Sequence, residues 1–371
     1  MSNPFLDLLV VGSGGGPDET NLSAYLIKPC NASWEAGILA LEAGSGQGAL
    51  NQLLLRNPDL FSTSNTTPPV RHSASEIYSF VRAFLLSHAH LDHLQSLVIS
   101  AGSLSGPRKR LYALKGVLED AETVFGNRLW PNLASWDETD EDYKYLYAPL
   151  YNNGKYQELE SFPQVSVKVV PVNHGYYETS GQYDSSAFFI RDNNAGKEFL
   201  FFGDVEPDSL SASPRTIDVW RLAAPKIPDQ LNAIFIECSW PSSREDDMLH
   251  GHLKPEHLRD ELLVLAKQVY VSRNPSAVAG TSRTSGPRTR PNRKKQKLNP
   301  EPTATPTLEP EALHGILDGL RVYVMHCKEQ LDGRPGQPMK DLIVGQVRAL
   351  VDAEKLGVEV FSVDQGMHIK I

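Results

Sequence analysis

The stretch Leu85-Leu-Ser-His-Ala-His-Leu-Asp-His-Leu-Gln-Ser-Leu-Val-Ile-Ser100 carries four side chains of the kind that bind metal ions. They fall within six residues: His88, His90, Asp92 and His93. The apolar run at 81–86, in which Arg82 is the one polar residue, precedes them and predicts a buried strand. Leucine and valine residues follow at helical spacing, so the four side chains fall on a strand-to-helix turn that can direct them at one point.

The chemistry of this turn favours a transition metal. Three neutral imidazoles and a carboxylate suit Zn²⁺, or a borderline ion such as Mn²⁺ or Fe²⁺. His88 and His90 are two residues apart, so they share a face if the segment is extended. Asp92 and His93 lie beyond them and can serve a second ion nearby. A polar surface turn is the alternative, and the density of ligand types in six residues argues against it.

Three more ligand-type residues stand where predicted strands end. His174 follows the strand at 165–172, Asp204 follows the strand at 198–202, and His326 follows the strand at 321–325. Rigid strands hold the residues at their ends in fixed positions. Each residue alone would be typical of a structural histidine or a turn aspartate. Their recurrence beside the dense motif favours one shared metal site.

Composition sets the class of protein. The 371 residues are enough for one large domain or two modest ones, and 40% hydrophobic with 22% charged residues is ordinary for a soluble globular protein. No apolar run reaches transmembrane length, and the N-terminus, Met1-Ser-Asn-Pro, lacks the basic region and long apolar core of a signal peptide. Three scattered cysteines fit free thiols in a reducing compartment. We therefore expect a cytoplasmic protein, with a nuclear fraction left open.

Charge separates one segment from the rest. The formal net charge of −9 argues against general nucleic-acid binding. Residues 272–310 are nevertheless rich in Pro, Ser, Thr and Arg, and 272–297 hold eight Arg or Lys. Such a segment cannot bury a core, so we expect a disordered basic insertion in a single metal-binding domain that spans residues 1–371. A nuclear-localisation or anion-binding tract at 288–297 is the alternative.

Hydrophobic patterning predicts an α/β protein. A first strand at 5–11 ends in the glycine-rich segment 12–17, which is either a tight turn or a set of amides that face an anion. Segment 130–162 mixes acids with aromatic residues, and we interpret it as a surface insertion, with an active-site flank as the alternative. Further strands are predicted at 22–28, 37–42, 110–114, 185–191, 233–238, 358–363 and 367–371. Helices are predicted at 49–56, 76–80, 116–126, 217–224, 255–268 and 339–356.

These motifs resemble a known family. His88-Ala-His-Leu-Asp-His93 resembles the signature of the metallo-β-lactamase fold, with His174, Asp204 and His326 at its later motif positions. The longer stretch from His88 to Ile99 resembles the class II cyclic-nucleotide phosphodiesterases of fungi and some bacteria. Three other segments are similar to that family: the Gly-Gly-Pro turn with Asn21-Leu-Ser-Ala-Tyr25, Ile236-Glu-Cys-Ser-Trp-Pro241, and Gly251-His-Leu253. Ala101-Gly102 departs from the family pattern, beyond the ligands.

The resemblance implies a fold and a cofactor. The fold is a four-layer αββα sandwich, and the cofactor is a pair of Zn²⁺ ions, for which Mn²⁺ or Fe²⁺ could substitute. Carried over by residue, the first ion would be held by His88, His90 and His174. The second ion would be held by Asp92, His93 and His326. Asp204 would bridge the two ions together with a water or hydroxide.

The resemblance also implies an activity. The enzyme would hydrolyse 3′,5′-cyclic nucleotides, cAMP and cGMP, to 5′-nucleotides by attack of the bridging hydroxide, and so attenuate cyclic-nucleotide signalling. Asp92 and His252 are the catalytic candidates. Asp92 would orient the nucleophile, and His252 would protonate the leaving oxygen or hold the phosphate, with a structural histidine as the equal alternative for His252. Asn21 and Ser23 are weaker candidates for contacts with substrate.

Two other functions stay open at this stage. The tRNA 3′-processing nucleases share the HxHxDH motif and usually carry a basic arm, which the insertion at 272–310 could supply. A nucleotide-binding regulatory protein is the other, although a binding module has no need for a complete two-metal ligand set. The expected partner is a small cyclic nucleotide rather than a membrane or a nucleic acid, and a homodimer is compatible with the sequence. The preference between adenine and guanine is left open.

Overall fold

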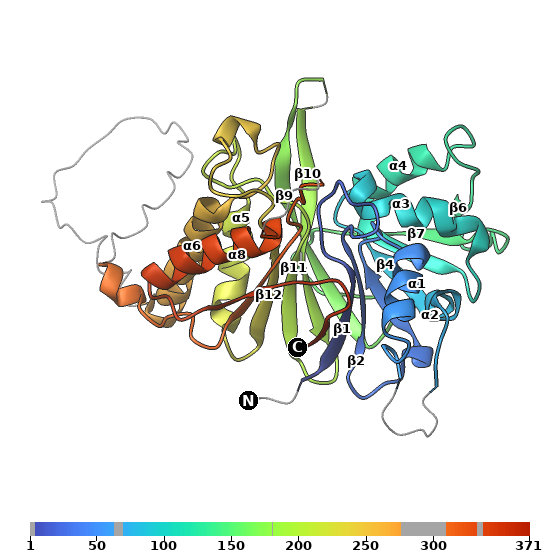
Figure 1. The fold of residues 1–371 in the computed structure, drawn as a ribbon, viewed down its shortest axis with the longest axis horizontal. Coiled ribbons are helices and arrows are strands. Elements are labelled where there is room, and N and C mark those ends of the chain that lie inside the picture. The colour runs from blue at the N-terminus through green and yellow to red at the C-terminus, as the bar shows by residue number, and fades with distance from the viewer. Residues whose placement is uncertain (1–3, 63–69, 180, 276–308, 332–336) are drawn as a thin grey trace, which may run out of the picture.

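Two β-sheets lie face to face, and helices cover the outer face of each sheet (Figure 1). The computed structural model describes residues 4–62, 70–179, 181–275, 309–331 and 337–371. The layers follow the order helix, sheet, sheet, helix, which confirms the predicted αββα sandwich. Within the described ranges, no helix is long and apolar enough to cross a membrane.

The first sheet has the strand order β15-β1-β2-β3-β4-β5-β7-β6. Its strands are β1 (Leu6–Gly12), β2 (Ala24–Pro29), β3 (Ile38–Leu41), β4 (Val81–Leu85), β5 (Lys109–Leu114), β6 (Ala134–Ser135), β7 (Tyr145–Leu150) and β15 (His368–Lys370). The elements on its helical side are η1 (Trp34–Ala36), α1 (Gln47–Arg56), α2 (Ala74–Phe80), α3 (Leu91–Ser100), η2 (Ala101–Ser103) and α4 (Lys115–Val124). The last strand of the chain, β15, returns to pair antiparallel with β1.

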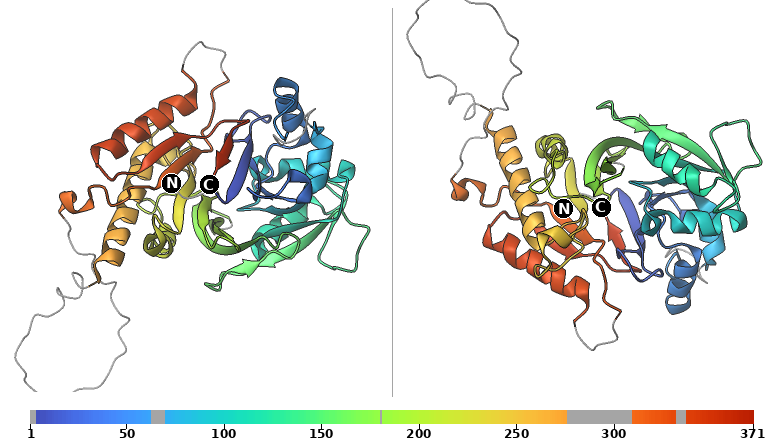
Figure 2. Two further views of the ribbon diagram at one scale, coloured as in Figure 1. Left: turned by 90° about the horizontal axis from the view of Figure 1, so that it is seen from below. Right: turned by 90° about the horizontal axis from the view of Figure 1, so that it is seen from above.

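The second sheet has the order β14-β13-β12-β11-β10-β9-β8. Its strands are β8 (Gln157–Glu158), β9 (Val165–Tyr177), β10 (Gly181–Asp192), β11 (Glu198–Phe202), β12 (Leu231–Glu237), β13 (Arg321–Met325) and β14 (Glu359–Ser362). The helices of this half are α5 (Thr216–Ala223), η3 (Ala224–Lys226), η4 (Asp246–Met248), α6 (Pro255–Arg273), η6 (Pro310–Leu313) and α8 (Met339–Ala353). Figure 2 shows the two halves of the chain on either side of the sheet–sheet interface.

Three apolar clusters hold the layers together. One lies between the sheets and contains Tyr25, Phe201 and Phe235, and one lies under the helices of each half. Strands such as β1 are buried along their whole length, which explains their continuous apolar sequences. Burial of a large apolar side chain contributes about 1.5–3 kcal/mol, so the inner cluster fixes the position of the strand ends that face the site.

Two interpretations of the sequence were wrong. Segment 130–162 is not a surface insertion, because β7 pairs parallel with β5 inside the first sheet and Tyr145 is fully buried, with its hydroxyl donating to the carbonyl of Leu97 (2.9 Å). The predicted strand at 165–172 is also longer. The β9–β10 pairing continues past a register shift between Gln182 and Asp184, so His174 lies inside β9 rather than after it.

The predicted basic insertion at 272–310 falls mostly outside the described residues. At the edges of the insertion, α6 continues to Arg273 and η6 begins at Pro310. The other predicted strands and helices are confirmed to within a few residues at each end. The glycine-rich segment is a tight turn, since the amides of Gly14 and Gly15 donate to the carbonyls of Asn21 (2.9 Å) and Cys327 (3.2 Å) rather than facing an anion.

Candidate metal centre

Strand ends from both sheets bring the predicted ligands together. The turn from β4 into α3 carries the four ligand-type residues of the motif, and three strands of the second sheet supply the rest. The contributors are His88, His90, Asp92 and His93 from the turn, His174 from β9, Asp204 after β11 and His326 after β13. Because β4, β11 and β13 are parallel to neighbouring strands, their carboxyl ends can present side chains at one edge.

The seven side chains form two groups of four that share one member. Within each group, one ligand atom per residue lies within 4.8 Å of all the others. The first group is His88, His90, His174 and Asp204, and the second is Asp92, His93, Asp204 and His326. This is the division that the family resemblance implied, with Asp204 shared.

Asp204 directs one carboxylate oxygen at each group. Its Oδ1 lies 3.2 Å from Nε2 of His93 and 3.3 Å from Nε2 of His326. Its Oδ2 lies 3.6 Å from Nε2 of His174 and 3.8 Å from Nε2 of His88. A carboxylate in this position can bridge two cations.

Each imidazole of the two groups turns one nitrogen inward and places the other against a protein atom. Such outer contacts orient metal-binding histidines and fix their tautomers. The outer contacts are His88 Nδ1 with Ser87 Oγ (2.9 Å), His93 Nδ1 with Glu42 Oε2 (3.4 Å), His174 Nδ1 with the Gly251 carbonyl (2.9 Å), His326 Nδ1 with Ser239 Oγ (3.0 Å), and His90 Nε2 with the Tyr177 hydroxyl (3.1 Å).

Two buried polar atoms of the first ligand group lack a hydrogen-bond partner among the described residues. They are Nε2 of His88 and Oδ2 of Asp204, which lie in fully or almost fully buried side chains. An unsatisfied buried polar atom costs free energy, and a cation between these two atoms would satisfy both. The residues therefore fit a metal ion, and their nitrogen and carboxylate donors are the set that Zn²⁺ prefers.

The pKa shifts of the ligand groups favour the binding of a cation. Burial lowers the pKa of His90 and of His174 to about 4 and that of His88 well below its ordinary value, so these imidazoles are neutral at pH 7, as metal ligands must be. Burial opposes the charge of Asp204, yet the facing His326 and His93 hold the pKa of its carboxyl well below the usual range. The second group therefore contains a carboxylate–imidazolium contact whose proton a cation would replace.

Two carboxylates at the centre were not anticipated. Glu237, at the end of β12, is fully buried, and its Oε1 accepts from Nδ1 of His252 (2.9 Å) and from the amide of Val205 (2.9 Å). Glu42 follows β3 and faces His93. Both stand at strand ends, which was the signal that identified Asp204, but a single glutamate without a histidine motif beside it looks like any turn residue.

His252 lies at the centre, next to the second group. Its ring stacks on His326 with centroids 5.3 Å apart and is 6% exposed, and burial lowers its pKa to about 3. Together with Glu237 and His326 it forms a further group of potential ligands. A cavity of about 290 Å³ opens beside His252 and is also lined by Glu206, Asp246 and Asp247.

The weaker candidates for contacts with substrate are Asn21 and Ser23. Asn21 Oδ1 accepts from the amide of Ser13 (3.0 Å) and so shapes the glycine turn, whose Gly15 packs against His326. Ser23 is 1% exposed. Neither residue belongs to a ligand group.

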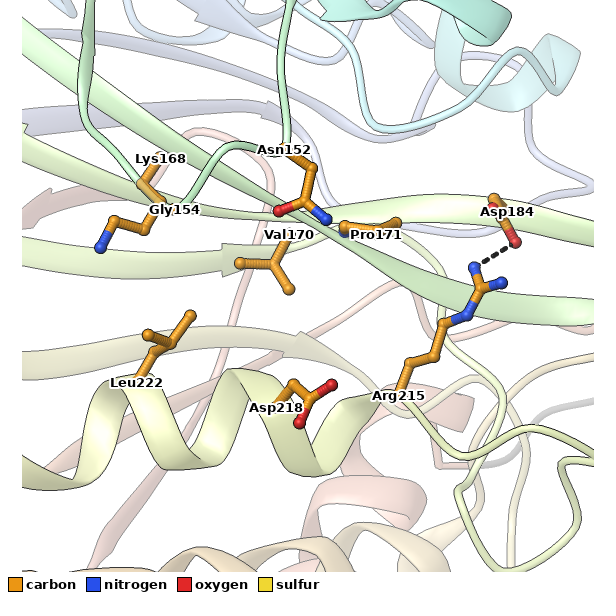
Figure 3. A pocket seen from close by; sticks show the side chains of 9 residues that line it. All are labelled: Asn152, Gly154, Lys168, Val170, Pro171, Asp184, Arg215, Asp218 and Leu222. Carbon is orange, nitrogen blue, oxygen red and sulfur yellow. Dashed lines mark ion pairs between the residues drawn. The ribbon is translucent and has the colours of Figure 1, made fainter. Parts of the chain in front are cut away.

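A larger cavity lies away from the centre. It has a volume of about 520 Å³ and sits between β9 and α5, where Arg215 and Asp184 form an ion pair of 2.8 Å (Figure 3). Lys168 and Asp218 also line it, and none of the seven predicted ligands does.

An αββα sandwich with ligand-bearing strand ends at one edge is the architecture of a metallo-β-lactamase-fold protein, and solved structures share it. Unliganded yeast PDE1 has a TM-score of 0.74 at 20% identity, over 98% of this chain and 99% of that one. The metallo-β-lactamase fold protein YhfI from Bacillus subtilis (TM-score 0.52, 11% identity) covers 98% and 99%, and human tRNase Z, short form (0.50, 12%), covers 98% of both chains. These likenesses concern the fold.

The chain belongs to the class-II cAMP phosphodiesterases, whose family model matches residues 50–366. A relative named 3′,5′-cyclic-nucleotide phosphodiesterase from Schizosaccharomyces pombe is 32% identical over 279 residues, which cover 71% of this chain and 75% of the relative. A relative of the same name from Aliivibrio fischeri is 31% identical over 264 residues, or 70% and 75% of the two chains. The family expected from the motifs is confirmed.

Proposed function

We propose that this protein hydrolyses 3′,5′-cyclic nucleotides, cAMP and cGMP, to 5′-nucleotides and thereby attenuates cyclic-nucleotide signals. The observation that carries the proposal is the pair of ligand groups sharing Asp204, found in a chain of the class-II cAMP phosphodiesterase family. The relatives from fission yeast and Aliivibrio are named for this reaction and cover about 70% of the chain. Both sheets supply ligands, which supports a single domain.

The proposed cofactor is a pair of Zn²⁺ ions. His88, His90 and His174 would hold one, Asp92, His93 and His326 the other, and Asp204 both. When bound, the ions supply a nucleophile at neutral pH and neutralise charge on the phosphate oxygens. The chain itself orients the imidazoles through contacts of Nδ1 with Ser87, Gly251 and Ser239, so that Nε2 faces inward at three of the positions.

The proposed general acid is His252. Glu237 holds its Nδ1, which leaves Nε2 to meet the leaving 3′-oxygen of a cyclic phosphate. The neutral imidazole would gain its proton in the presence of the anionic phosphate, which raises the pKa of a neighbouring histidine, and Glu237 would balance the positive charge. Asp92 reaches His326 Nε2 with its Oδ2 (3.3 Å) and is 26% exposed at its side chain, so it can contact both a metal ion and the incoming nucleophile.

The test joins metal analysis to identification of the product. Purified protein is expected to contain two equivalents of zinc per chain and to convert cAMP to 5′-AMP, with no 3′-AMP, as separated by chromatography. A zinc-loaded protein that leaves cAMP and cGMP intact would contradict the proposal. Cleavage of a tRNA precursor by that same preparation would assign the centre to RNA processing instead.

A further inference from the structure

The β9–β10 hairpin extends past the candidate metal centre and carries three tyrosines. Figure 1 shows β9 and β10 projecting beyond the other strands. Their pairing reaches Tyr177 and Gly181. Tyr176 is 70% exposed and Tyr177 is 45% exposed, although large aromatic side chains are usually covered. The hairpin therefore presents aromatic surface to solvent at the edge of the centre.

The two inner tyrosines are tied to a proposed ligand. The Tyr177 hydroxyl lies 3.1 Å from Nε2 of His90. The ring of Tyr183 stacks on His90 with centroids 4.7 Å apart and an interplanar angle of 6°, and its hydroxyl accepts from the amide of Ala89 (3.3 Å). Tyr177 and Tyr183 meet edge to face at 5.6 Å. These contacts make one wall of His90, Tyr183 and Tyr177 that begins at the centre and ends at the surface.

Such a wall suits a flat aromatic ligand. A base stacked on an aromatic side chain gains about 1–3 kcal/mol, and the contact tolerates different bases because each has a π face. When the phosphate of a cyclic nucleotide occupies the centre, its base extends outward. Nδ1 of His90 faces the centre, and Nε2 of the same ring contacts the Tyr177 hydroxyl. Only the imidazole of His90 and this one hydrogen bond therefore separate Tyr177 from the centre. The cavity at His252 is an alternative place for the base, but three carboxylates line it, and its one ring is the imidazole of His252, the proposed general acid.

We propose that the ring of Tyr177 stacks on the nucleobase of the substrate, while its hydroxyl positions His90. The inference rests on the proposed cyclic-nucleotide activity and names the part of the site that reads the base. Recognition through a π face accepts adenine and guanine alike, so cAMP and cGMP would both be bound.

The experiment compares substrates with and without a base. Tyr177→Ala, Tyr177→Phe and the matched control Tyr176→Ala are assayed on cAMP and on the 3′,5′-cyclic phosphate of methyl riboside, which lacks the base. Tyr177→Ala should raise KM for cAMP on the order of tenfold relative to KM for the base-free compound. Tyr177→Phe should keep the wild-type ratio of the two KM values, because its ring is retained, but should lose zinc faster to a chelator. Tyr176→Ala should match the wild type in both measurements.

A binding titration keeps this inference separate from the activity. Calorimetry with 5′-AMP and with ribose 5-phosphate measures the contribution of the base in the same variants. If the wild type hydrolyses neither cyclic phosphate, the proposed function fails, and the titration alone decides the stacking. An unchanged preference for 5′-AMP in Tyr177→Ala, or an equal loss in Tyr176→Ala, overturns the proposal. Glu206→Gln is titrated as well, and a loss confined to this variant also overturns the proposal, because it would place the base in the cavity at His252.

Discussion

Replacement of Gly15 by alanine should disable the centre, although Gly15 is not itself a proposed ligand. A Cβ at this position would lie 2.4 Å from both Cε1 and Nδ1 of His326 and 2.8 Å from its carbonyl oxygen. Ordinary contacts between carbon atoms are about 3.5–4.0 Å, so one of the two residues must move by about 1 Å. The turn is anchored, because Lys328 donates to the Gly15 carbonyl (2.7 Å) and His326 donates its amide to Ser13 (2.6 Å). The imidazole of His326 is therefore the group that shifts.

The expected loss follows from that shift. Misplacement of a site group by about 1 Å can cost about 100-fold in rate. Gly15→Ala should thus lower kcat/KM for cAMP about 100-fold and reduce the zinc retained after dialysis, while overpacking destabilises the fold by about 1–3 kcal/mol. Zinc analysis, turnover and thermal unfolding would be measured together. Gly48→Ala is the matched control, since no atom lies within 4 Å of the added Cβ. Full zinc content and normal turnover in Gly15→Ala would refute the steric argument.

Three further changes test other parts of the site and fold. His252→Ala should lower turnover about 10²–10⁴-fold, as expected for a general acid, with both zinc ions retained; loss of a zinc ion by metal analysis would make His252 a ligand instead. Removal of zinc by a chelator should abolish turnover and lower the melting temperature, and zinc should restore both, because an ion that binds only the folded state stabilises it. Burial raises the pKa of Glu261 to about 7 from 4.5, so its stabilising contribution is present below pH 4.5 and is lost as the pH rises through 7. Urea unfolding at pH 4.5 and 8 would measure the free energy of unfolding of the wild type and of Glu261→Gln. Between these pH values the wild type should lose up to about 3 kcal/mol more than the variant. An equal difference between the two proteins at both pH values would contradict the raised pKa.

The proposed ligands were predictable because imidazoles are uncommon and cluster. Three histidines in a six-residue turn indicate a metal, and this raises the significance of single residues such as His174 and Asp204 at other strand ends. Glutamates are common at strand ends, so Glu237 and Glu42 carry no comparable signal. Their roles depend on which imidazole nitrogen they face, and only the packing of both sheets determines that.

Both wrong strand predictions concern tertiary features that local sequence patterns do not show. The sequence around β7 mixes tyrosines with acids and therefore resembles an exposed segment, but Tyr145 and Tyr147 are buried by helices that are distant in sequence. The extension of β9 depends on a register shift opposite Gln182, which hydrophobic alternation does not reveal. The wall formed by Tyr177 and His90 depends on the same shift, so it could not be predicted from local patterns.

The shared position of Asp204 between ligands of the two sheets has a consequence for how the enzyme matures. His93 and His326, whose Nε2 atoms lie 3.1 Å apart, are separated by 233 residues of chain. Contacts between residues so distant along the chain form late in folding, because a long loop must close before they gain anything. A nascent chain that has formed β1 to β7 would hold the whole HxHxDH turn, yet it would lack His174, Asp204 and His326 and so would complete neither ligand group. Enzymatic turnover would therefore begin only when both sheets have met, and its appearance after refolding would time the docking of the two halves.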